Sequence, residues 1–427
     1  MYENDYDSYI GIKAGRGKYN ISVISAIAFL YFTRYSFLSF ATTFSLSTAF
    51  VGGSMLILFF AFLIFYTVKY QKNIAWDGIL LILFVWIFFE ITIKIHPEYQ
   101  YRYIDEYHNG RFSMQKIFTF GAGIYTYYLV RLFKHSKDKL YNLFSVIAYI
   151  ILFFDIWTAF IGKSEEYGMG FGYQMELAAI IFLARYLEEK KSKVHLLLSL
   201  ICIGMGVLYG SRACVIGYIL FLIIYMLWKR RFQWKQLLLS GMALLAAVAV
   251  NSTAAMMAVY NIASSLGFQS RTLYLLAMGN ILGTDTARQD RLWPAVIEQL
   301  NKMPWYRGMG AYGDRTLYST YYGYCHNFIL EILATFGILI GGIFLLWMLI
   351  QFAKVIINNK DYNGLMTIVF GCFALGKLFF SNTFWQEPYF WTFLAMLVNC
   401  AYQRRKTKVQ ERTYGLLDQM AYRRGKA

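Results

Sequence analysis

The chain has 427 residues, of which 58% are hydrophobic and 15% are charged, and its formal net charge is +17. A soluble domain carries about 25% charged residues, so this composition excludes an ordinary water-soluble protein. Apolar runs recur from one end of the chain to the other, and about 20 apolar residues span a bilayer as a helix. Because lipid offers no partner to backbone polar groups, we predict an all-α polytopic membrane protein.

Residues 1–20 are acidic and then basic, without the apolar core and small-residue cleavage site of a signal peptide. We therefore expect the first span to anchor the chain uncleaved. Hydropathy predicts about twelve spans within a single transmembrane domain that covers residues 1–427. In chain order these are 21–41, 46–68, 74–93, 117–132, 141–161, 172–187, 194–210, 213–228, 236–258, 327–352, 363–381 and 388–402.

The distribution of basic residues predicts the orientation. With the N-terminus inside, the inner segments hold 27 of the 41 Lys and Arg, including eight in the tail at 403–427. The three short outer connections hold only Lys163. Because inner loops collect Lys and Arg, both termini are expected in the cytoplasm, and the positive charge does not require nucleic acid as a partner.

One connection is far longer than the others. Residues 259–325 form an outer loop between the ninth and tenth predicted spans, and loops of this length usually carry function. The stretch "ARQDRLWPAVIEQLNKMPW" predicts an amphipathic helix, because Leu292, Val296, Leu300 and Met303 recur at helical spacing. It is followed by "GMGAYGD", a flexible glycine turn that ends at Asp314.

Four arginines are candidates for binding an anion. Arg212 lies in "LYGSRACVIG", a tight turn between two spans, where it either snorkels to the interface or forms an anion site. Arg271, Arg288 and Arg291 lie in the long loop, the last two near the expected helix N-terminus. A guanidinium suits bidentate phosphate recognition and a helix N-terminus adds positive potential, although ordinary salt bridges are the alternative.

His326 opens the tenth span. A lone histidine at a helix start is usually structural, but it is also the first residue type for acid–base work near neutral pH. Asn327 is expected to cap the helix. Glu331 lies about 140° round the helix from His326, so helical stacking does not make it an orienter of the ring.

Three further polar residues lie near the outer ends of spans. Lys377 either snorkels or contacts phosphate. Gln174 and Glu176 either cap their helix or bind sugar hydroxyls. The histidines are isolated and no nucleotide-binding motif occurs, so we expect neither a metal nor a cofactor.

Three motifs occur in fixed order on the predicted outer face: "GSRAC", then "SRTLYLLAMGNILGTDTARQDRLWPAVIEQLNKMPWYRGMGAYGD", then "HNFILEILATFGILIGG". This set, over residues 210–342, resembles the O-antigen polymerase and ligase superfamily of bacterial surface-polysaccharide assembly. The resemblance implies a GT-C-like glycosyltransferase in the bacterial plasma (inner) membrane. Its donor would be an oligosaccharide on undecaprenyl pyrophosphate in the outer leaflet, with no metal and no nucleotide sugar.

The resemblance also implies roles for individual residues. Arg212 matches the family's turn arginine, Arg271 and either Arg288 or Arg291 match its loop arginines, and His326 matches its helix-start histidine. The loop departs from the commoner pattern, in which an arginine stands about four residues before a Trp-like position. Arg288 is five residues before Trp293 and Arg291 two, so the register between these two is open.

The resemblance implies catalysis by His326, Arg212 and Arg288, and pyrophosphate binding by the four arginines. Our own candidates for further substrate contacts are Asn327, Gln174, Glu176, Lys377 and Asp314. The expected function is polymerisation of an O-antigen or capsule, with membrane lipid and a chain-length regulator as further partners. A ligase that uses a different acceptor, a flippase for lipid-linked oligosaccharide and a structural membrane protein are the alternatives.

Overall fold

The computed structural model describes most of the chain. The described residues are 9–14, 17–69, 74–99, 114–134, 138–160, 169–189, 192–209, 213–229, 253–265, 273–274, 277–278, 291–317, 325–379 and 381–424. They form a helical bundle, apart from one antiparallel hairpin of β1 (Tyr9–Ala14) and β2 (Gly17–Ser22).

The predicted spans lie on helices in the described part of the chain. These are α1 (Val23–Phe32), α2 (Arg34–Thr42), α3 (Thr48–Lys69), α4 (Trp76–Ile95), α6 (Met114–Arg131), α7 (Lys139–Phe160), α8 (Met169–Glu188), α9 (Lys193–Tyr209), α10 (Ala213–Lys229), α15 (Phe328–Asn358), α16 (Tyr362–Leu378) and α17 (Pro388–Arg424). Shorter elements are η2 (Pro97–Tyr99), α12 (Thr253–Ser265), α14 (Trp293–Lys302) and η6 (Gly313–Leu317).

Four described helices are long and apolar enough to cross a membrane, or five if the bent pair α1 and α2 counts as one span. Most of the ninth predicted span, 236–258, lies outside the described residues. Several membrane-span candidates are therefore present, and the count of twelve stays a prediction.

The bundle has a buried centre and an apolar rim. Helix α16 and the middle of α8 are almost wholly buried, with Leu177, Phe182 and Phe370 at 0% exposure. Helix α3, in contrast, exposes large apolar side chains such as Ile57 at 70%. Exposed apolar surface of this extent is what lipid covers in a membrane protein.

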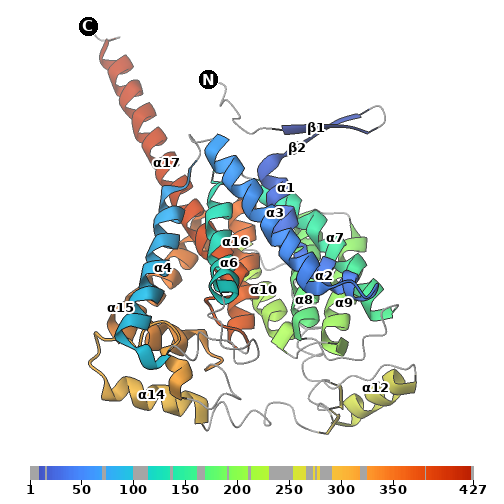
Figure 1. Cartoon of the computed structure of the whole chain (residues 1–427). Helices are drawn as coiled ribbons and strands as arrows, with labels where there is room; N and C mark the ends of the chain where they lie inside the picture. The colour runs from blue at the N-terminus through green and yellow to red at the C-terminus, as the bar shows by residue number, and fades with distance from the viewer. Residues whose placement is uncertain are drawn as a thin grey trace.

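The two ends of the bundle differ. Helices α12 and α14 lie at one end, which we call the loop end (Figure 1). The hairpin lies at the opposite end of the bundle, and α17 projects beyond this same end (Figure 1). We call it the tail end. The basic tail predicted at 403–427 is a helical continuation of the last span as far as Arg424.

An ion pair holds helices together near the tail end. Arg131 Nε donates to Asp77 Oδ2 at 2.6 Å and joins α6 to α4. Arg131 also donates to the Asn399 side chain on α17, whose amide nitrogen donates to Val130 O at 3.0 Å. The charges of Arg131 and Asp77 therefore have partners within the bundle and do not indicate a substrate site.

Candidate functional site

Helix α15 is interrupted at Gly337. This residue has φ +82° and ψ 164°, a conformation that is nearly restricted to glycine. The interruption leaves carbonyl groups of the preceding turn without helical partners. A free carbonyl inside a membrane protein has a high energetic cost, so a break of this kind requires another partner.

The glycine turn of the long loop supplies that partner. Met309 N donates to Ala334 O at 2.6 Å, and Gly310 N donates to Thr335 O at 3.1 Å. On the other side of the break, Leu339 N donates to Trp305 O at 3.0 Å. The turn expected to be flexible is therefore hydrogen-bonded to the span that follows it.

The turn also contacts α4. Ala311 N donates to Thr92 Oγ1 at 3.3 Å, and the Tyr312 ring meets Phe89 edge-on with centroids 5.4 Å apart. Gly310 adopts φ +83°, and a Cβ atom there would stand 2.6 Å from Thr92 Cγ2. The turn is thus wedged between α4 and α15.

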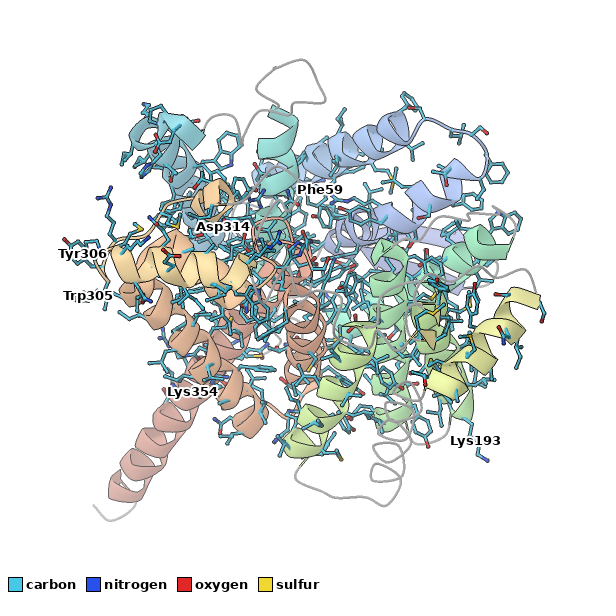
Figure 2. All side chains as sticks on the ribbon, turned by 90° about the horizontal axis from the view of Figure 1, so that it is seen from below. Phe59, Lys193, Trp305, Tyr306, Asp314 and Lys354 are labelled. Carbon is cyan, nitrogen blue, oxygen red and sulfur yellow. The ribbon has the colours of Figure 1, made fainter. Side chains whose placement is uncertain are left out.

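Helix α14 covers the same region, as its periodicity predicts. Leu292, Val296 and Leu300 are buried, and they pack in a cluster with Met309 and Ala334. Trp293 Nε1 donates to Cys325 O at 3.0 Å, which ties the start of α14 to the residue before His326. The rings of Trp305 and Tyr306 instead point outward and are 59% and 60% exposed (Figure 2).

His326 lies at the bend just before α15 and is partly buried. Its backbone is left-handed, with φ +54°. Asn327 caps the helix as predicted: its Oδ1 accepts from Ile329 N at 3.0 Å and from Leu330 N at 3.3 Å. The Asn327 oxygen is thus committed to the helix, and a contact of its amide with substrate stays a prediction.

Next to His326 is a cluster of two buried acids and an arginine. Asp314, in η6, accepts from Cys325 N at 3.2 Å, and Glu331, in α15, accepts from Thr383 Oγ1 and Phe384 N. The charge of Arg315 acts on both carboxylates, which also repel one another. We call Asp314, Arg315 and Glu331 the acid–arginine cluster.

Burial changes the acidity of Asp314 and Cys325, two groups that precede the span formed by α15. It raises the pKa of Asp314 above its ordinary value, although the Arg315 charge opposes the shift. It also raises the pKa of the Cys325 thiol, which donates to Asn327 O at 3.2 Å. Cys325 is therefore kept as an unreactive thiol.

A second polar cluster lies between α8, α16 and the start of α17. Lys377 Nζ lies 2.6 Å from Glu387 Oε2, and Asn382 Nδ2 donates to the same oxygen at 2.8 Å. The Glu387 side chain is fully buried and that of Lys377 is 17% exposed. The predicted alternatives for Lys377 were snorkelling and phosphate contact; the structure adds a buried ion pair. We call Lys377, Glu387 and Asn382 the ion-pair cluster.

Glu176 faces this cluster from α8. Its carboxylate is buried, forms no hydrogen bond within the described residues, and feels the charges of Lys377 and Glu387. It occupies a gap that two glycines leave open, since a Cβ atom on Gly217 would stand 1.9 Å from Glu176 Oε1 and one on Gly376 3.9 Å. Glu176 is therefore the least satisfied polar side chain among the predicted substrate contacts.

Gln174 precedes Glu176 by two residues, about half a turn of α8, and faces α7. With its amide nitrogen toward α7, it donates to both Asp155 carboxylate oxygens at 3.0 and 3.1 Å. In the opposite amide orientation, Gln174 Oε1 accepts from Ser36 Oγ of α2 at 3.3 Å. Gln174 thus joins three helices, and a further role in sugar binding stays a prediction.

The connection between α16 and α17 joins the two clusters. Thr383 and Phe384 bind Glu331, whereas Asn382 and Glu387 belong to the ion-pair cluster. Asn382 has φ +67°, and Tyr312 beside the acid–arginine cluster has φ +61°. With His326, three of the four described non-glycine residues of positive φ lie around these clusters, and strained backbone is concentrated at functional sites.

Of the four arginines predicted to bind pyrophosphate, only Arg291 is among the residues that the structure describes. Arg212, Arg271 and Arg288 lie outside the described residues. Arg291 is exposed and lies two residues before the start of α14. The structure therefore brings Asp314 close to His326 in one region, and Glu176 and Lys377 together in another.

The sequence analysis does not single out Arg315 or Glu387. Arg34 stands inside an apolar run and is, like Lys377, a candidate for snorkelling or for a phosphate contact. The Arg34 guanidinium lies over the rings of Tyr31 and Tyr35, 4.4 and 4.6 Å from their centroids, and its charge acts on Tyr389. Arg315 carries a signal that could have found it, because it directly follows the glycine turn. Within the described residues, no three His, Cys, Asp or Glu are grouped as metal ligands.

The comparisons with known proteins agree with the position of these motifs. A family model described as O-antigen ligase matches residues 197–346, which is about a third of the chain. The match runs from α9 through the long loop and across the interruption at Gly337. Neither a curated protein nor a solved structure matches the chain. Residues 197–346 of this multi-pass membrane chain therefore match the O-antigen ligase family, in agreement with the resemblance that the sequence motifs show.

Proposed function

We propose that the chain is a glycosyltransferase that polymerises a bacterial surface polysaccharide, an O-antigen or a capsule. It would transfer the growing glycan from undecaprenyl pyrophosphate to the next lipid-linked repeat unit. The family match supports a role of the ligase or polymerase type on lipid-linked glycans. The observation that carries the proposal is the docking of the glycine turn onto the break in α15, which brings Asp314 and Arg315 to the residues flanking His326.

The reaction is a displacement at the anomeric carbon of the donor sugar. The acceptor hydroxyl oxygen forms the new glycosidic bond, and its proton passes to the His326 ring. The bond between the anomeric carbon and the pyrophosphate oxygen breaks, and undecaprenyl pyrophosphate leaves with the electron pair. A histidine positioned for such a transfer contributes about 10²–10⁴-fold.

The leaving pyrophosphate needs positive charge near it. Arg212, Arg271 and Arg288 or Arg291 would supply this charge as preorganised donors, each worth about 10²–10³-fold in rate. One direct displacement implies inversion at the anomeric carbon. NMR of a single new linkage, compared with the anomer of the donor, tests this step; retention would contradict it.

The proposal includes the membrane arrangement. About twelve spans would cross a bacterial plasma membrane with both termini in the cytoplasm, and the loop end would face the outer leaflet. This arrangement is supported by α14, which lies at the loop end (Figure 1) and is joined through Trp293 to Cys325, the residue before His326. A flippase would instead be expected to have two comparable halves and a polar site near the midplane.

A ligase is the second candidate, because the description of the matching family favours it. The same residues would serve both reactions, and only the acceptor differs. The deciding experiment uses purified protein with one lipid-linked repeat unit, without metal or nucleotide. A ladder of products supports a polymerase, a single transfer to another added acceptor supports a ligase, and lipid movement without transfer supports a flippase.

A further inference from the structure

Another polar region lies at the tail end, outside the acid–arginine cluster and the ion-pair cluster. Here a cavity of about 670 Å³ opens between the C-terminal turns of α15 and the middle of α17. Lys354 and Lys360 line it from one side, and Arg404 and Arg405 from α17. Asp361 is the only acid in the lining, so the lining carries a net positive charge.

Hydrogen bonds fix the position of the Arg404 guanidinium without pairing it with a negative charge. Arg404 Nη1 donates to Asn359 Oδ1 at 2.5 Å and Nη2 donates to Gln351 Oε1 at 2.9 Å. Both acceptors are neutral amides, so the guanidinium keeps its full charge. A guanidinium has five N–H donors, and these two bonds leave others for a ligand.

The remaining charges of the lining are distributed unequally. Lys354 and Arg405 are exposed and take part in no ion pair within the described residues. Asp361, in contrast, is engaged as the cap of α16, where its Oδ1 accepts from Gly364 N at 2.9 Å. Lys360 points toward the end of α10 and donates to Trp228 O. Three basic side chains are thus left to face an anion.

The surroundings of the cavity indicate what kind of anion it holds. The apolar run of α15 ends at Asn358, in the cavity wall. Just before it, Leu349 and Ile350 are 63% and 42% exposed, and Ile357 is 51% exposed. A ligand at this place therefore meets positive charge at one end and an exposed apolar helix surface at the other.

We propose that this cavity binds the phosphate of an anionic phospholipid, whose acyl chains lie along the exposed apolar face of α15. An arginine fork matches phosphate oxygens bidentately, and lysines add charge without geometric demand. A free inorganic anion would use only the basic groups and would gain nothing from the apolar face. This inference requires the chain to lie in a membrane, but it does not depend on the reaction proposed above.

The test measures lipid binding to the full-length protein in detergent by native mass spectrometry. The probes are phosphatidylglycerol, which is anionic, and phosphatidylcholine, which is zwitterionic. We expect selective retention of phosphatidylglycerol, and we expect its affinity to fall about 10-fold to 30-fold in the double variant Lys354→Gln, Arg405→Gln. The control is Lys193→Gln: this exposed lysine at the start of α9 lies far across the bundle from Lys354 (Figure 2) and should leave the affinity unchanged.

Four results would overturn the proposal. Equal retention of both lipids would show that charge does not select the ligand. Unchanged binding in the double variant, or an equal loss in Lys193→Gln, would place the lipid elsewhere. Displacement of the lipid by millimolar inorganic phosphate would identify a site for the free anion. Both substituted side chains are exposed, and an unchanged elution volume on size exclusion verifies that the variants fold.

Discussion

The backbone of Gly308 lies directly against the backbone of Gly337. A Cβ atom added to Gly308 would stand 2.6 Å from Gly337 N and 2.2 Å from Thr335 O. No side chain fits between these segments without moving one of them. The long loop and the tenth predicted span are therefore one structural unit, joined where the helix is interrupted.

Substituting Gly308 or Gly337 should separate the long loop from α15. In Gly337→Ala the alanine would have to adopt a conformation that costs about 1–3 kcal/mol, and in Gly308→Ala the new methyl group would push the loop from the helix. We expect a lower thermal unfolding midpoint in detergent and loss of long polymer in cells. Gly342→Ala is the matched control, because nothing lies within 4 Å of a Cβ atom there. Equal effects at all three positions would mean that the contact between Gly308 and Gly337 is not responsible.

Lys377→Met should destabilise the protein strongly. It would leave the fully buried Glu387 carboxylate without its cation, and breaking a buried pair typically costs about 3–5 kcal/mol. The measurement is the thermal unfolding midpoint, together with the yield of folded protein. Lys302→Met is the control, since its pair with Glu298 is 66% and 67% exposed and should be dispensable. An unfolding midpoint within error of the parent for Lys377→Met would show that the pair is not closed in solution.

Asp314 should make stability depend on pH. Burial raises its pKa in the folded state, so the neutral form is favoured by folding. Its contribution is therefore complete at low pH and decreases as the pH rises from the ordinary value of 3.8 through the raised folded value. Asp314→Asn keeps an acceptor for Cys325 N but does not titrate, so the difference between the unfolding midpoints of the two proteins should change with pH. A constant difference from pH 4 to 7 would contradict the buried position of this carboxyl.

His326 has two separable properties, a ring and a left-handed backbone. His326→Asn removes the base but keeps a residue that tolerates positive φ, so we expect a stable protein without polymer formation. His326→Gly removes the ring and relieves the backbone, and we expect the same loss of activity with stability at least equal to that of the parent. If His326→Asn still makes chains of normal length, the ring is structural and the general base is another group.

The arginines that the family resemblance implicates should matter for transfer and not for membrane insertion. Arg212→Ala and Arg288→Ala are each expected to reduce the rate about 10²–10³-fold while the protein still reaches the membrane. Arg291 is exposed before α14, so Arg291→Ala compared with Arg288→Ala decides which of the two fills the family position. Polymer length on gels, normalised to protein in the membrane fraction, is the measurement. The reverse order of effects would shift the register to Arg291.

Helix positions could be read from the sequence because hydropathy is a local property. The predicted span 46–68 corresponds to α3 and the span 74–93 to α4. The cap at Asn327 and the buried face of α14 were also predictable, since both depend on residues within a turn or two. Patterns of this kind need no knowledge of which helices are neighbours.

Contacts between distant segments could not be read in this way. Lys377 and Glu387 are ten residues apart, but their pairing depends on a connection whose shape is set by Asn382 and by Glu331 on another helix. The break in α15 was invisible because "TFGILIGG" also fits a continuous apolar helix. Only the docked turn explains why the break lies at Gly337.

Helix α17 is a single continuous helix, and polar contacts hold it at three levels. Glu387 holds its start at the loop end, Asn399 binds the backbone of α6, and Arg404 binds Asn359 and Gln351 near the tail end. With a rise of about 1.5 Å per residue, Pro388–Arg424 extends about 55 Å. A rotation of this helix about its axis, or a shift along that axis, would break all three attachments together. Helix α17 therefore couples the two ends of the protein. A displacement of α17 at the cavity near Arg404 would move its other end, at the ion-pair cluster, as part of the same rigid body.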